Sequence, residues 1–225
     1  MTMQVHATIH DPPGTAPAPP LSFLFVGDAL ALDLVNTEIV VRRNAIDLLT
    51  GPGAYAAWWH AAASHHPDMV ARLPAGASEA NPELLPNVIT LRGALREIFG
   101  AVANGAMIPA DALAILNRVL EGVDDAIELS VTGEPRPLLV PRAPAADGPL
   151  AAVARSAFAL LTEGESSRLH HCANERCVLY FYDTTKSATR RWCSTACMNR
   201  ARSSRRYRER RQAADQSLSS TSGPP

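Results

Sequence analysis

All four cysteines of this 225-residue chain lie between positions 172 and 197, in the spacing C-x4-C-x15-C-x3-C. Two pairs of thiolates fill the tetrahedral shell that structural Zn²⁺ prefers and leave no position open for water or substrate. A segment of about 40 residues cannot build an adequate core alone, so metal coordination is expected to stabilise it. The spacing predicts one structural zinc ion, bound by Cys172, Cys177, Cys193 and Cys197.

Two alternatives to a four-thiolate site follow from the neighbouring sequence. Disulfide bonds would require an oxidising compartment, but residues 1–20 have no Lys or Arg and are proline-rich where a signal peptide needs its apolar core. No apolar stretch approaches the roughly 18 residues of a membrane span. We therefore expect a cytoplasmic protein without a membrane partner. The second alternative is that His170 or His171 replaces one thiolate.

Charge is divided unevenly along the chain, although the formal net charge is only -1. Residues 168–211 carry 12 basic and 3 acidic side chains, whereas residues 1–167 carry 9 basic and 18 acidic ones. Such an asymmetry predicts different partners for the two parts.

The pattern of apolar residues predicts a mainly α, α+β protein. Residues 1–20 and 212–225 are expected to be unstructured tails, because their Pro-, Ala- and Ser-rich composition buries little apolar surface. Between them we predict a helical domain over residues 21–166 and a zinc finger with a basic helix over residues 167–211. Helical periodicity marks five segments of the first domain, beginning at Asp28, after Thr50, near Val88, near Pro109 and at Pro149. Asp28 is predicted to cap the first of these helices.

Two β-hairpins are also predicted. Alternation at Ile127, Leu129 and Val131, followed by a Thr-Gly-Glu turn, predicts the first, in the helical domain. In the finger, Leu179 to Tyr182 is predicted to pair with a returning strand at Arg190 to Trp192. Zinc knuckle, hairpin, knuckle and helix form a treble-clef-like arrangement, with Phe181 and Trp192 as a small core and Cys193 and Cys197 at the start of the helix.

The predicted last helix, Ser194–Arg211, has arginines on all sides and no apolar stripe beyond its first turns. Such a helix has no face to dock on its own protein, and like charges at i, i+4 repel. Guanidinium groups suit phosphate oxygens and guanine edges. The alternative is an unstructured basic tail that binds nucleic acid nonspecifically. We predict nucleic-acid contacts from Arg190, Arg191, Asn199, Arg200, Arg202, Arg205, Arg206, Tyr207 and Arg208.

Several short runs of the sequence form recognisable motifs: Cys172-Ala-Asn-Glu-Arg-Cys177, Asp183-Thr184, Arg190-Arg191-Trp192-Cys193-Ser194, Cys197-Met198-Asn199-Arg200, the run from Phe25 to Thr37, and Asp47-Leu-Leu49. These runs resemble the bacterial CGNR zinc-finger proteins, which have an N-terminal ABATE domain. Met198 occupies the glycine position of the name-giving motif, and the second cysteine pair is one residue shorter than in the family. The resemblance implies a transcription regulator with a zinc finger for DNA and a first domain that is a possible sensor.

Two motif residues have two interpretations each. Asn199 either contacts a base or phosphate, or hydrogen-bonds the knuckle backbone. Arg200 either pairs with phosphate or braces the hairpin through Asp183.

Polar residues on an apolar helix suggest a ligand pocket in the first domain. Asp33, Asn36 and Thr37 are placed to line a small-molecule pocket for an effector, although local backbone bonds also explain such residues. No HExxH, Ser-His-Asp, Walker or GxGxxG arrangement is present, so we do not expect an enzyme.

Together these features predict a zinc-dependent transcription regulator that binds duplex DNA, with a sensor or regulatory domain and a possible homodimer. The alternatives are an RNA-binding module or a basic helix that docks on an acidic protein surface, including the chain's own first domain. A small-metabolite-binding protein or enzyme ranks behind these.

Overall fold

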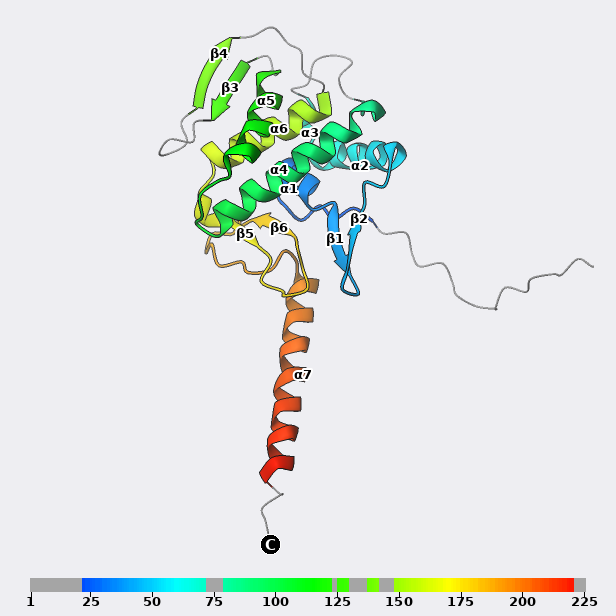
Figure 1. Ribbon diagram of the computed structural model, residues 1–225, viewed down its shortest axis with the longest axis vertical. Helices are drawn as coiled ribbons and strands as arrows, with labels where there is room; N and C mark the ends of the chain where they lie inside the picture. The colour runs from blue at the N-terminus through cyan, green and yellow to red at the C-terminus, as the bar shows by residue number, and fades with distance from the viewer. Residues whose placement is uncertain (1–21, 72–78, 123–124, 130–136, 142–147, 221–225) are drawn as a thin grey trace, which may run out of the picture.

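The computed structural model describes residues 22–71, 79–122, 125–129, 137–141 and 148–220 (Figure 1). The tail predicted at residues 1–20 lies outside these ranges. Helices dominate, and the strands form two-stranded antiparallel hairpins, which confirms the mainly α, α+β prediction. The elements are α1 (Leu30–Val35), β1 (Glu38–Val41), β2 (Asn44–Asp47), α2 (Pro52–His65), α3 (Pro67–Val70), η1 (Pro82–Leu84), α4 (Leu85–Ala103), α5 (Ala110–Glu121), β3 (Asp125–Leu129), β4 (Pro137–Pro141), α6 (Gly148–Thr162), η2 (Ser166–Arg168), β5 (Leu169–His171), β6 (Tyr180–Tyr182) and α7 (Thr195–Ser220).

The main core surrounds the short helix α1, all six residues of which are buried. This helix packs between α4 and α6, and α2 adds the large side chains of Tyr55 and Trp58. Apolar residues of α4 recur at helical spacing on its buried face, as the sequence predicts. The helix ends at Ala103 with Asn104 as its C-cap, and Gly105 follows with a φ of 62°, the left-handed conformation that glycine favours.

The cap predicted for the first helix is wrong. Ala29, not Asp28, occupies the N-cap of α1, and no side chain caps it. Asp28 has a φ of 64°, and its carboxylate binds Arg190 at 2.7 Å. The Asp28 side chain therefore forms a long-range ion pair instead of the local capping bond that the sequence pattern predicts.

A hairpin that the sequence pattern did not reveal, β1–β2, joins the first domain to the finger. Ile39 from β1 and Leu48 after β2 are buried in one cluster with Leu179, Phe181 and the zinc-ligand candidates. Trp192 packs against the same cluster, so the predicted Phe181–Trp192 core is present. It is shared with the first domain, and the finger therefore does not pack as an isolated unit.

The returning strand predicted at Arg190 to Trp192 is wrong. Strand β6 pairs with β5, with Leu169 opposite Tyr182 and His171 opposite Tyr180. Residues 183–190 fold back around the carboxylate of Asp183, which accepts bonds from Thr185 and from the Arg190 backbone. Arg191 then lies beside the first zinc knuckle and not beside β6, and its carbonyl oxygen accepts a hydrogen bond from Ala173 N at 2.8 Å.

Helix α7 begins at the second cysteine pair and extends away from the rest of the molecule (Figure 1). It continues to Ser220, so the unstructured tail predicted at residues 212–225 is wrong for residues 212–220, and residues 221–225 lie outside the described ranges. Residues 212–216, Gln-Ala-Ala-Asp-Gln, contain good helix formers, which accounts for the longer helix.

Candidate metal centre

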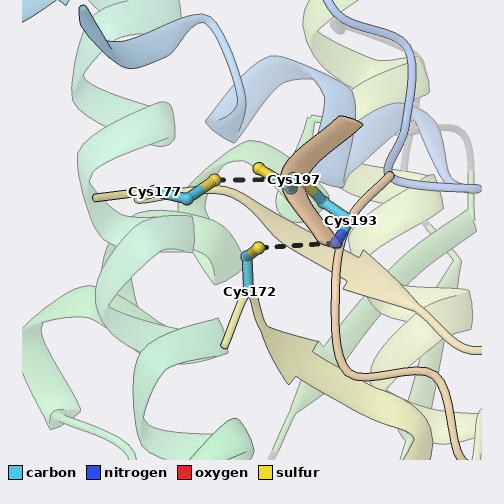
Figure 2. A group of neighbouring side chains, drawn as sticks. All are labelled: Cys172, Cys177, Cys193 and Cys197. Atoms are coloured by element: carbon cyan, nitrogen blue, oxygen red, sulfur yellow. Dashed lines mark hydrogen bonds between the residues drawn. The ribbon is translucent and has the colours of Figure 1, made fainter. Parts of the chain in front are cut away.

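The four cysteine sulfurs converge at the junction of β5, β6 and α7 (Figure 2). Cys172 directly follows β5, Cys177 precedes β6, and Cys193 and Cys197 lie at the start of α7. All four Sγ atoms lie within 4.8 Å of one another, and those of Cys177 and Cys193 are 3.8 Å apart. The cysteines are free thiols, not disulfides.

This geometry fits one tetrahedral zinc ion. Zinc–sulfur bonds of about 2.3 Å place the sulfurs of a tetrahedron about 3.8 Å apart. Cys172, Cys193 and Cys197 are buried and Cys177 is partly buried, so a bound ion would have no open coordination position. The site is therefore structural, and neither Met198 nor the short second spacing prevents the sulfurs from converging.

Hydrogen-bond donors surround the sulfurs. Cys193 N donates to Cys172 Sγ at 3.5 Å, and Arg200 donates to Cys197 Sγ at 3.3 Å. The buried amide of Asn174 lies 3.6 Å from Cys197 Sγ and 3.4 Å from the Cys197 carbonyl, while its Oδ1 accepts from Arg176 N. Donors that bond to ligand sulfurs in this way orient the ligands and disperse thiolate charge.

Crowding of the sulfurs shifts the pKa values of the thiols. Hydrogen bonds from Cys177 and Cys193 stabilise the Cys172 thiolate and lower its pKa to about 2. The hydrogen bond with Cys172 raises the pKa of Cys177 to about 12 and also raises the pKa of Cys193. A bound divalent cation would lower the pKa values of Cys177 and Cys193 and favour their thiolate forms.

The two histidines beside Cys172 have other roles. The His170 ring packs on Phe181 with centroids 5.5 Å apart, and His171 meets the edge of Tyr180 at 5.1 Å. Among the described residues, the ligand cluster consists of the four cysteines. The histidine alternative is therefore not supported.

Arg190 holds the finger against the first domain. Its guanidinium binds Asp28 at 2.7 Å, donates to Cys193 O at 2.6 Å and lies 4.4 Å from the centroid of Phe181. We therefore leave Arg190 out of the nucleic-acid interface. Of the two interpretations of Arg200, the brace through Asp183 is not supported, because the Arg190 backbone donates to that carboxylate and Arg200 bonds to Cys197.

Most arginines of α7 are exposed, and few have an acidic partner. Arg205 pairs with Glu209 at 3.5 Å, and Arg208 pairs with Glu175 at 2.6 Å, which lowers the pKa of Glu175. Arg202 and Arg206 form no ion pair with any residue that the structure describes. Asn199 and Tyr207 are also exposed, and Arg191 lies 5.2 Å from the Trp192 ring.

The candidate pocket residues of the first domain are buried and bonded within the protein. Asp33 accepts from Gly27 N at 2.9 Å and pairs with His66 at 2.8 Å. Thr37 donates to Leu34 O and accepts from Arg92, and Asn36 bonds to Tyr180. These bonds account for the burial of the three residues, and an effector site there stays a prediction.

Comparison with known protein families gives two matches. Residues 28–164 match ABATE, described as "Putative stress-induced transcription regulator", and residues 168–211 match the CGNR zinc finger. A comparison with curated proteins found no match. None of the described helices is both long and apolar enough to cross a membrane. The first match covers more than half of the chain and the second contains all four clustered cysteines, so the protein belongs to the ABATE family and carries a CGNR zinc finger with one structural Zn²⁺ site.

Proposed function

We propose that this protein is a transcription regulator in which the zinc finger fixes the start of α7 and the arginines of that helix bind duplex DNA. The observation that carries the proposal is the composition of α7. It has seven arginines but only two carboxylates, Glu209 and Asp215, and it extends away from the acidic first domain. A concentration of exposed positive charge of this kind is stabilised by a polyanion.

A groove beside α7 strengthens the proposal. It has a volume of about 810 Å³ and runs between the first knuckle and the helix. Among the described residues that line it, Glu175 is the only carboxylate, while Trp192 and Tyr207 add aromatic surface that can contact sugars or bases. Its basic lining residues are Arg176, Arg191, Arg202, Arg205 and Arg208.

The zinc site determines where these arginines lie. Cys193 and Cys197 belong to the first turn of α7 and the residues just before it, and Ser194 Oγ accepts from Cys197 N at 3.2 Å as an N-cap. Loss of zinc is therefore expected to weaken DNA binding through loss of helix placement, although no arginine is changed.

The test is a salt titration of binding by the full-length protein to duplex DNA. If about six phosphates are contacted, a plot of log affinity against log salt has a slope near -5. Replacing two unpaired arginines in the variant Arg202→Gln/Arg206→Gln should reduce the magnitude of that slope by about 1.8. The control, Arg118→Gln/Arg155→Gln, removes two charges from α5 and α6 and should leave the slope unchanged.

Three results would overturn the proposal. Undetectable or salt-insensitive binding to duplex DNA would show that α7 is not a polyanion-binding surface. Equal slopes for the α7 variant and the control would place the interface elsewhere. Tighter binding of a duplex RNA of the same length would mean that RNA, and not DNA, is the target.

A further inference from the structure

The turn between β1 and β2 has an unusual pair of residues. Val41 pairs with Asn44, so Arg42 and Arg43 form a two-residue hairpin loop. Their φ angles are 51° and 74°, both in the left-handed region. Hairpin loops of this geometry favour Asn-Gly, because other side chains are strained there. Two arginines at these positions are therefore not explained by the folding of the hairpin.

Neither arginine is used to hold the protein together. Both side chains are exposed, and neither forms an ion pair or hydrogen bond with any residue in the described part of the chain. Strained backbone that carries unpaired charge is a feature of ligand-binding positions, where the geometry places a side chain toward its partner.

The turn lies beside the first turns of α7. In Figure 1 the β1–β2 hairpin points out of the body on the side where α7 emerges. Residues of both elements line one hollow of about 470 Å³, together with the first zinc knuckle. Arg42 and Arg43 contribute from the hairpin, Arg176 from the knuckle and Arg200 from α7, and none of the lining residues that the structure describes has a carboxylate.

Four guanidinium groups around one hollow repel one another unless an anion lies among them. Asn199 and Ser203 of α7 line the same hollow and add hydrogen-bonding groups that suit phosphate oxygens. This hollow lies on a different part of the finger surface from the groove described above, although Asn174, Arg176, Ser203 and Ser204 border both.

We propose that the Arg42–Arg43 turn of the first domain is a second phosphate-binding element, which grips the DNA backbone next to the segment contacted by α7. This inference rests on the proposed function. It makes the ABATE domain part of the nucleic-acid interface, so the DNA would be held between a hairpin and a helix.

The test uses a variant that improves the turn while removing its charge. Arg42→Asn/Arg43→Gly installs the residues that this turn geometry favours, so its melting temperature should equal or exceed that of the native protein. Its affinity for duplex DNA should fall about tenfold, and the magnitude of its salt slope should fall by about 1.8. Arg42→Lys/Arg43→Lys, which keeps both charges, should retain most of the salt slope.

The control is again Arg118→Gln/Arg155→Gln, which has the same change in net charge. If the turn variant matches this control while Arg202→Gln/Arg206→Gln loses binding, the second element is refuted and the proposed function stands. If the native protein does not bind duplex DNA, both proposals fail together.

Discussion

Asn36 and Tyr180 are joined by two buried hydrogen bonds. Asn36 Nδ2 donates to the Tyr180 carbonyl at 2.9 Å, and the Tyr180 N–H donates to Asn36 Oδ1 at 2.9 Å. The amide of Asn36 therefore bonds to β6 as the backbone of a neighbouring strand would. Because Asn36 ends α1 and Tyr180 lies between the first knuckle and Asp183, this contact connects the centre of the first domain with the finger.

Replacing Asn36 by Ala should destabilise the protein by about 3 kcal/mol, because a buried N–H and a buried carbonyl both lose their partner. The free energy of unfolding in urea measures this effect. Asn104→Ala is the matched control, since the Asn104 amide makes an exposed bond to Gly100 O at 2.8 Å. Equal losses of stability in the two variants would show that the buried Asn36–Tyr180 bonds contribute no more to stability than the exposed bond of Asn104.

Cys193→Ser should reduce zinc from one ion per chain to a sub-stoichiometric amount, because a hydroxyl is a poor substitute for a buried thiolate ligand. Zinc content after gel filtration provides the measurement. Ser194→Ala is the control: it removes the cap of α7 at a cost of about 1 kcal/mol and should keep zinc. Full zinc retention in Cys193→Ser would contradict the four-thiolate site.

Arg190→Met should lower the free energy of unfolding by about 2 kcal/mol, because Asp28 and the Cys193 carbonyl lose a charged donor that is only 25% exposed. The salt slope of DNA binding should stay at the native value, measured under conditions where the variant remains folded. If Arg190→Met has native stability but a reduced salt slope, Arg190 contacts DNA and belongs to the nucleic-acid interface.

Asp47→Asn should change how stability depends on pH. Bonds from Arg92 lower the pKa of Asp47 below its usual 3.8 in the folded protein. The contribution of this pair is therefore fully present above that value and is lost as pH falls through the folded-state pKa. The variant should be less stable than the native protein near neutral pH and lose less stability on acidification.

Urea unfolding at a series of pH values measures this difference. Glu163→Gln removes an exposed carboxylate outside the Arg92 network and should keep the native profile. If stability falls equally with decreasing pH in Asp47→Asn and in the native protein, the Asp47–Arg92 pair does not contribute to the pH dependence of stability.

The zinc ligands and the main helices were predictable because their signals are local. Four cysteines in two close pairs specify a tetrahedral site, and α4 and α5 follow from apolar spacing with a recognisable end at Asn104-Gly105. The β3–β4 hairpin was likewise visible as alternation at Ile127 and Leu129, while Val131 and the predicted Thr-Gly-Glu turn lie outside the described residues.

The features that were missed depend on distant parts of the chain. Arg190 and Asp28 are 162 positions apart, so neither the lost cap of α1 nor the structural role of Arg190 has a local signal. The β1–β2 hairpin has four-residue strands and an Arg-Arg turn in place of a glycine signal. Asn174 could have been found, because an Asn two residues after a ligand cysteine is well placed for an Asx turn.

The length of α7 gives its attachment a mechanical consequence. Its 26 residues span about 39 Å at 1.5 Å each, while two cysteines clamp only the base. A tilt of about 10° at that base would move the far end by about 7 Å, which is close to the distance between successive phosphates along one DNA strand. If α7 binds DNA as proposed, a small distortion of the four-sulfur site would therefore shift the far end of the helix by about one phosphate along the double helix.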